Sequence, residues 1–124
     1  MEKSLTLVFL PCFHRQTMGS DLLPGTLDLL ILSSLTRSPR HGYGIAQHLK
    51  KISEDVLEVG ESSLYPALQR LLLNGWVSAE WGASENNRRA RYYKLTAAGR
   101  KQLTAENKDF ARMILAIQKV LSCA

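Results

Sequence analysis

The sequence has few cysteines and no long apolar segment, and both shortages narrow the class of protein. Only Cys12 and Cys123 occur in 124 residues, at opposite ends of the chain and outside any Cys-x-x-Cys pair. This pattern indicates neither a disulfide framework nor a thiolate metal site. No apolar run approaches the roughly 20 residues that a membrane helix needs. We therefore expect a protein of the reducing cytoplasm with no membrane partner.

The sequence also lacks the short motifs that carry common enzyme chemistry. It contains no Gly-x-Ser-x-Gly, no His-Glu-x-x-His and no phosphate-binding glycine loop. His41 and His48 lie seven residues apart and His14 lies near the N-terminus, a spacing that does not suit a metal site. We expect a protein that is not an enzyme and that needs no cofactor or metal ion.

Residues 1–19 form a leader that differs from the remainder of the chain. Residues 1–13 carry LTLVFLPCF after one lysine and so imitate a secretory signal. However, Pro11 interrupts the apolar run and no small-residue cleavage site follows. We expect this leader to be disordered or to reflect a non-native start, with Met18 as the true first residue.

What the chain does have is positive charge that is unevenly distributed. Sixteen Lys and Arg against eleven Asp and Glu give a net charge of +5. Four acidic residues cluster within residues 54–61, whereas six cations and no acid occupy residues 88–101. One side of the molecule should therefore be positive, as a polyanion-binding surface requires.

The length and the apolar periodicity predict one domain built from helices. A chain of 124 residues with 45% hydrophobic content suits a single core. We expect a first helix from Pro24 to Leu35, apolar nearly all round, although Leu29–Leu32 alone would also suit a buried strand. Residues 43–53 predict a second, amphipathic helix, and residues 54–60 predict a turn with a short strand.

A third helix is predicted between residues 62 and 75. Proline has no N–H to donate and clashes with the carbonyl four residues back, so Pro66 places the helix start at Ser62 or Ser63. Either serine can cap the exposed N–H groups. Gly75 supplies the C-terminal stop. One face of this helix carries leucines, and the opposite face is polar apart from Leu73.

Two paired strands and a cationic loop are predicted next. Residues 77–81 and 91–95 alternate in polarity, and the loop Gly82–Arg89 holds residues that turns accept. We expect Trp76 and Trp81 to anchor this ribbon in the core. The alternative interpretation is that these aromatic residues line an effector pocket in a dimer.

The C-terminal residues 97–124 predict a dimerisation helix with Thr96 as its cap. A seven-residue recurrence there is typical of a short coiled coil, and a polar Asn at one core position is of the kind that fixes register. Its members are Leu103, Asn107, Phe110, Ile114, Ile117 and Leu121. So short a heptad could instead pack on the chain's own first helix. We expect both, with the partner's last helix covering Gly25–Leu35.

Three helices followed by a two-stranded ribbon make a winged helix-turn-helix, here over residues 20–96, so the predicted fold is mainly α with a small β-ribbon. The segments LLPGTLDLLILSSL, HGYGIAQHL, SSLYPALQRLLLNGW and NNRRARYYKLTAAGR resemble the PadR family of bacterial transcriptional regulators. The similarity is to its short subgroup with a single C-terminal dimerisation helix, and it covers residues 20–121. It implies a homodimeric DNA-binding repressor, often released by a small molecule, which in some relatives is flat and aromatic.

The candidate DNA contacts lie on the third helix and on the ribbon. In a winged helix the third helix enters the major groove, where Gln suits an adenine edge, Arg suits a guanine edge, and Ser or Tyr suits phosphate. The candidates are Ser62, Ser63, Tyr65, Gln69 and Arg70 on the helix, and Asn87, Arg88, Arg89 and Arg91 on the ribbon. Because strand residues alternate, Arg91 and Lys94 should point to opposite faces, which favours Arg88 and Arg89. The plainer interpretation of both groups is a solvated polar surface.

These features predict a sequence-specific transcriptional regulator that binds double-stranded DNA. We expect a repressor that binds a pseudo-palindromic operator as a homodimer, with two third helices about 34 Å apart. We also expect a small aromatic effector to release it. The alternatives are a winged-helix protein-interaction module, which the arginine-rich ribbon disfavours, and a MarR-like regulator, which shares the Leu-Thr-x-x-Gly pattern.

Overall fold

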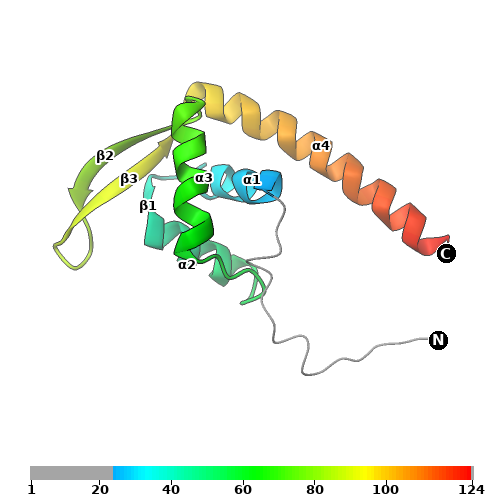
Figure 1. Ribbon diagram of the computed structural model, residues 1–124, viewed down its shortest axis with the longest axis horizontal. Coiled ribbons are helices and arrows are strands. Elements are labelled where there is room, and N and C mark those ends of the chain that lie inside the picture. The colour runs from blue at the N-terminus through cyan, green and yellow to red at the C-terminus, as the bar shows by residue number, and fades with distance from the viewer. Residues whose placement is uncertain (1–23, 124) are drawn as a thin grey trace.

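The computed structural model describes residues 24–123, and four helices and a three-stranded antiparallel sheet form a winged helix-turn-helix (Figure 1). In chain order the elements are α1 (Pro24–Ser34), β1 (Arg40–His41), α2 (Gly42–Ile52), α3 (Glu61–Leu73), β2 (Val77–Ala83), β3 (Arg89–Leu95) and α4 (Ala97–Ser122). The predicted fold class is confirmed. The leader and its Met18 lie outside the described residues. Among residues 24–123, none of the helices combines the length and the apolar character that a membrane span requires, and no group of His, Cys, Asp or Glu side chains could hold a metal ion.

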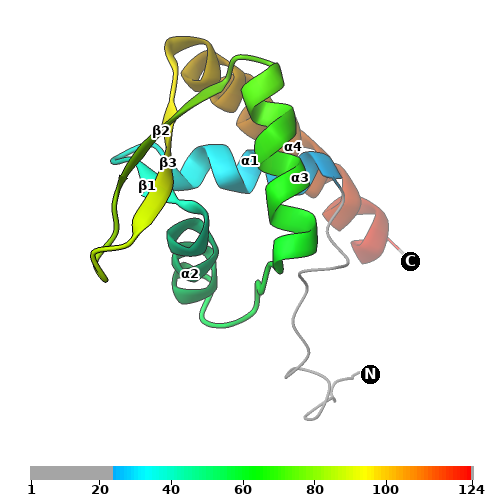
Figure 2. The same ribbon diagram turned by 60° about the vertical axis from the view of Figure 1, so that its left-hand side comes forward.

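Helix α1 lies at the centre of the domain, against α2, α3 and α4 (Figure 2). Leu27, Leu29, Ile31, Leu32 and Leu35 are all buried within the single chain. The apolar character of α1 therefore reflects burial on several sides by its own domain, as a helix that is hydrophobic all round requires. The premise that a small winged domain cannot cover this helix is therefore wrong, and the packing of a partner's last helix on Gly25–Leu35 stays a prediction.

Helix α2 begins with a side-chain cap and a close approach to α3. The Nδ1 atom of His41 accepts a hydrogen bond of 2.9 Å from the backbone N–H of Gly44, which satisfies one of the exposed N–H groups of the first turn. A Cβ atom on Gly42 would lie 2.7 Å from the hydroxyl oxygen of Tyr65. A side chain at position 42 would therefore have to displace the Tyr65 ring of α3.

Helix α3 begins one residue earlier than predicted and ends as predicted. Gly60 is its N-cap and gives no side-chain bond, so the prediction that Ser62 or Ser63 starts and caps the helix is wrong. Pro66 fits in the second turn because the carbonyl it leaves unpaired belongs to the exposed Ser62, which water can reach. At the C-terminal end Gly75 adopts a left-handed φ of 76°. The N–H groups of Gly75 and Trp76 bond back into the last turn at 3.0 Å each, which is a Schellman stop.

The sheet contains a third strand that the sequence did not reveal. Strand β1 pairs with β3 on the side opposite β2, with Arg40 facing Tyr93 and His41 facing Tyr92. Conversely, residues 54–60 begin with the predicted turn but form no strand, so the strand part of that prediction is wrong. Glu54 and Asp55 there adopt left-handed φ values of 55° and 69°, which reverse the chain and prevent an extended run.

The β2–β3 ribbon, called the wing below, is longer than predicted and extends beyond the core. Its inner face is apolar near the foot, where Val77, Tyr93 and Leu95 are buried. Trp76 packs against this core as predicted. Trp81 does not: it is 59% exposed, because it lies further along the wing than the core reaches. The prediction that Trp81 anchors the ribbon in the core is wrong.

The end of α3, the foot of the wing and the start of α4 meet at one junction. The Thr96 hydroxyl accepts a bond from the N–H of Gly99 and donates one of 2.7 Å to the carbonyl of Gly75. The N–H of Thr96 donates to the carbonyl of Trp76 at 3.1 Å. Gly99 packs directly on that carbonyl. Thr96 therefore caps α4 as predicted and also ties it to α3.

Helix α4 leaves the domain after its first turns (Figure 1). Leu103 and Phe110 are half-buried, Leu103 against the core of the domain and Phe110 in a groove against α1. Beyond them the heptad residues Ile114, Ile117 and Leu121 are exposed. The first part of the heptad therefore packs on the chain's own domain, and the second part, from Ile114 onward, remains exposed in the single chain.

Candidate nucleic-acid interface

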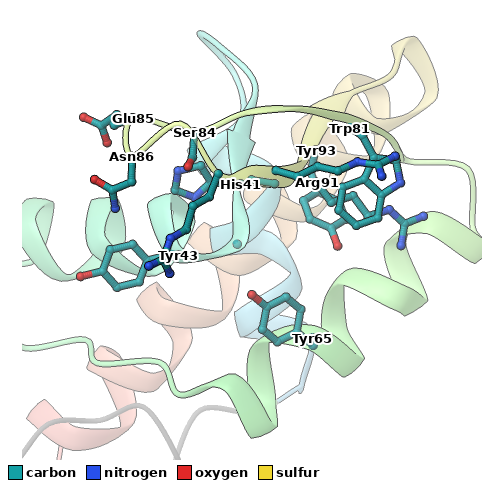
Figure 3. A pocket seen from close by; sticks show the side chains of 13 residues that line it. His41, Tyr43, Tyr65, Trp81, Ser84, Glu85, Asn86, Arg91 and Tyr93 are labelled. Carbon is teal, nitrogen blue, oxygen red and sulfur yellow. The ribbon is translucent and has the colours of Figure 1, made fainter.

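A cleft of about 580 Å³ lies between α3 and the outer part of the wing, with the start of α2 as its floor (Figure 3). We call it the α3–wing cleft. Its lining includes three arginines, Arg88, Arg89 and Arg91, and a single carboxylate, Glu85. Three cations against one acid make the cleft attractive to anions.

The wing arginines are held beside aromatic rings of the same face. The Arg89 guanidinium carbon lies 4.7 Å from the ring centre of Trp81, and that of Arg91 lies 5.8 Å from the ring centre of Tyr93. Both distances suit a cation–π contact. Lys94 is on the other face, as the predicted alternation requires. The structure therefore gathers Arg91 into the cleft together with Arg88 and Arg89.

The tip of the wing is a tight turn that depends on Asn87. Asn87 has a left-handed φ of 61°, which asparagine tolerates better than most residues. The N–H of Ser84 donates to the carbonyl of Arg88 at 2.7 Å, and the N–H of Asn87 donates to the carbonyl of Ser84 at 2.9 Å. The turn accounts for an asparagine at position 87 without any contact to DNA, and the predicted contact of Asn87 with DNA stays a prediction.

The outer face of α3 presents the predicted polar residues to solvent. Ser62, Tyr65 and Gln69 are exposed, whereas Ser63 is half-buried. Tyr65 projects from α3 into the cleft, and its hydroxyl points toward Gly42 at the start of α2 (Figure 3). Partial burial, and to a smaller extent the charge of Glu61, raises the pKa of Tyr65. Its hydroxyl therefore keeps its proton at neutral pH and is available as a hydrogen-bond donor.

Arg70 is already engaged within the domain. Its Nη2 atom lies 2.8 Å from a carboxylate oxygen of Asp28 in α1, and the Asp28 side chain is only 16% exposed. A partly buried pair of this kind holds the guanidinium more firmly than a fully exposed one. Of the five helix candidates, Arg70 is therefore the least free to reach a base edge.

Two residues of the cleft were missed by sequence reasoning. His41 caps α2 and lies edge-on to Tyr92 at 5.3 Å between ring centres, and Tyr43 is 67% exposed in the first turn of α2. Both line the α3–wing cleft (Figure 3). The signal was present in the His-Gly-Tyr-Gly run, because two glycines at a helix start indicate close approach of another element.

His48 on the neighbouring surface of α2 titrates at lower pH than an ordinary histidine. Burial lowers its pKa most, and the charges of Arg40 and Lys51 lower it further. The unfolded chain therefore binds a proton more readily, so stability falls as the pH drops through the ordinary value of about 6.5 toward the lower folded value. We expect His48→Gln to lose less stability than the wild type between pH 7 and pH 5, as measured by urea denaturation. If His48→Gln and the wild type lose the same stability between pH 7 and pH 5, groups other than His48 control the stability in this pH range.

Comparisons with known proteins agree with this geometry. The family described as the PadR-like family of transcriptional regulators matches residues 31–105, which is more than half of the chain. A protein of Lysinibacillus sphaericus, described as uncharacterized protein X, is 29% identical over 94 residues, covering 76% of this chain and 86% of its own length. The family match at residues 31–105 spans the helices and the wing that form the α3–wing cleft.

Solved structures show the same arrangement. A transcriptional regulator from Clostridium thermocellum is 28% identical with a TM-score of 0.72, covering 80% of this chain and 96% of that one. A PadR-like transcription factor from Bacteroides fragilis is 30% identical with a TM-score of 0.65, covering 82% of this chain and 95% of that one. Family match, fold and the cationic cleft agree, and the chain belongs to the PadR-like family of transcriptional regulators.

Proposed function

We propose that this DNA-binding regulator represses transcription by binding a pseudo-palindromic operator as a homodimer. The observation that carries the proposal is the α3–wing cleft, where three wing arginines and Tyr65 of α3 line one opening, with Ser62 and Gln69 exposed on the same helix. Phosphate contacts supply most of the affinity for a duplex, and base-edge contacts supply the specificity. One surface here offers both kinds of side chain.

In the proposed complex, α3 lies in the major groove and the wing follows the adjacent backbone. Gln69 on the exposed face of α3 suits an adenine edge, and the hydroxyls of Ser62 and Tyr65 suit phosphates. Arg88, Arg89 and Arg91 neutralise phosphates on the wing side. Ser63 and Arg70 have smaller roles, because Ser63 is half-buried and Arg70 is paired with Asp28.

The second half of α4 joins the two copies in this proposal. Ile114, Ile117 and Leu121 are 37%, 45% and 69% exposed, and they continue the heptad that Leu103, Asn107 and Phe110 begin. An apolar helical stripe exposed over several turns favours packing against a partner helix, because the contact removes apolar surface from water. A two-fold pair of α4 helices would place two α3 helices on one side of a duplex, with residues 20–96 as the reading domain.

We include a small aromatic effector in the proposed mechanism. A groove of about 330 Å³ between α1 and α4 is lined by Leu29, Phe110 and Met113, with Glu106 and Asp109 at its edge. Apolar walls with a few polar groups are typical of small-molecule sites. A second copy of α4 would close this groove, so a ligand there would alter the angle between the two domains.

A protein-interaction module is the alternative function, because many winged helices bind proteins. The family membership sets aside the MarR-like alternative. Selection of bound sequences from random duplexes separates the two functions that remain. A selected sequence with two inverted half-sites supports the proposed operator. No enrichment above background would favour the protein-interaction module.

Salt dependence tests the role of the wing directly. Each phosphate contact steepens the slope of log affinity against log salt concentration by about 0.9. Replacing both Arg88 and Arg89 by alanine should therefore flatten the slope by about 1.8 per protomer if each meets one phosphate. The measurement is a filter-binding titration at several salt concentrations.

Lys94→Ala is the matched control for this experiment. Lys94 lies on the opposite face of the wing and its loss also removes a positive charge. We expect it to change the slope much less than Arg89→Ala alone. Equal changes for the two single variants would mean that the wing acts only through its overall charge.

A further inference from the structure

The α3–wing cleft holds more exposed aromatic surface than a DNA duplex would use. Tyr43, Tyr65 and Trp81 line it and are 67%, 44% and 59% exposed. In a duplex the bases are stacked on one another, so it offers phosphates and groove edges but no base faces. The arginines of the cleft suit those phosphates. The aromatic faces suit a different ligand, one that carries a free planar ring.

Trp81 offers an aromatic face for a planar ring close to arginines that can bind a phosphate. The Arg89 guanidinium lies 4.7 Å from its ring centre, and more than half of the residue is still exposed. Arg91 faces Trp81 directly across the two strands. A ring stacked on Trp81 would therefore have two guanidinium groups within reach of an attached phosphate. Exposed aromatic side chains beside a cationic groove are what proteins use to hold unpaired bases.

We propose that the α3–wing cleft binds an unpaired nucleotide, with its base stacked on Trp81 and its phosphate held by Arg89 and Arg91. The cleft volume of about 580 Å³ lies within the usual range for a small-molecule site. The nucleotide can come from two sources that share this chemistry. One is a free mononucleotide, and the other is a nucleotide within a single strand.

A regulatory consequence follows, and it rests on the proposed operator binding. The nucleotide and the duplex would use the same arginines, so the two ligands would exclude each other. A nucleotide in the cleft would therefore release the regulator from DNA without any change of fold. This mode of release differs from one that acts through the α1–α4 groove, because it needs no movement of α4.

The experiment measures nucleotide binding to the full chain by equilibrium dialysis, with AMP in one arm and hexadeoxyadenylate in the other. Stacking on an aromatic side chain is worth about 1–3 kcal/mol per base, which is roughly a 5- to 150-fold loss on truncation. We expect Trp81→Ala to bind at least tenfold more weakly and Trp81→Phe to recover most of that loss. Arg89→Ala should also weaken binding, whereas the matched Lys94→Ala should not. Circular dichroism checks that each variant is folded.

The two arms identify the source. If the dissociation constant of AMP is within tenfold of that of hexadeoxyadenylate, the ligand is a mononucleotide. If hexadeoxyadenylate binds at least tenfold more tightly than AMP, the ligand is a nucleotide within a single strand. Absence of binding to millimolar AMP and to micromolar strand overturns the inference, as does equal binding by Trp81→Ala and wild type. Duplex binding is measured on the same preparation. Duplex binding without nucleotide binding overturns this inference alone, and the reverse result overturns the proposed operator binding alone.

Discussion

Gly99→Ala is expected to destabilise the domain by about 3 kcal/mol, at the upper end of what an overpacked site costs. A Cβ atom at position 99 would overlap the carbonyl oxygen of Trp76 and come within 2.9 Å of the Cδ1 atom of Leu95. The overlapped atom belongs to the backbone, so no side-chain rotation relieves the clash. Urea denaturation followed by circular dichroism measures the loss.

Gly25→Ala is the control for the Gly99 variant. Gly25 also lies in the first turn of a helix, but a Cβ atom there would meet nothing within 4 Å. We expect this variant to be neutral or more stable by up to about 1 kcal/mol, because alanine restricts the unfolded chain. A Gly99→Ala variant as stable as Gly25→Ala would mean that the junction of α3, wing and α4 moves easily.

Disruption of the exposed heptad is expected to have the largest effect on DNA binding. Ile117→Asp combined with Leu121→Asp places two charges in the proposed dimer interface, where they would be buried without partners. Both positions are exposed in the single chain, so the domain itself should stay folded. We expect a monomer by light scattering at micromolar concentration. Operator affinity should fall on the order of 10²-fold or more, because binding at one half-site no longer assists the other.

Gln118→Asp combined with Ser122→Asp is the matched control. It adds the same two charges at the same spacing on exposed positions of α4 that lie outside the heptad stripe. This variant should remain dimeric and bind the operator within a few-fold of the wild type. A wild-type chain that is monomeric at micromolar concentration would contradict the proposed dimer before any variant is made.

Local signals in the sequence were sufficient to predict most elements. Pro24 starts α1, because its missing N–H costs nothing at a helix start. Gly75 stops α3 by adopting the left-handed conformation. Thr96 caps α4, and strict alternation places Arg91 and Lys94 on opposite faces of the wing. Each of these features depends on one residue and its immediate neighbours.

Features that depend on distant residues were not predictable from the pattern. Strand β1 has only two residues, too few to show a period, and it forms because Tyr92 and Tyr93 pair with it. The Arg70–Asp28 contact joins residues 42 positions apart. Trp81 was placed on the correct face of the wing but in the wrong environment, because alternation does not show where the core ends.

The candidate site was predicted in part. Charge and helical spacing identified the three wing arginines and the outer face of α3, and the structure brings Arg88, Arg89, Arg91 and Tyr65 to one cleft. The other four candidates on α3 do not line it. His41 and Tyr43 were missed because they lie at the start of α2, 22 or more positions before Tyr65. Only the packing of α2 against α3 at Gly42 brings them together.

The junction of Gly75, Trp76, Thr96 and Gly99 has a consequence for the operator. It fixes the direction of α4 relative to α3, since Gly75 and Trp76, which follow the end of α3, bond directly to Thr96, the N-cap of α4. In the proposed dimer the separation of the two reading helices is therefore set by this joint and by the crossing of the two α4 helices. One extra base pair between half-sites rotates one of them by about 35° around the duplex axis. A rigid joint cannot follow that rotation, so the regulator would select operators by the number of base pairs at their centre as well as by their sequence.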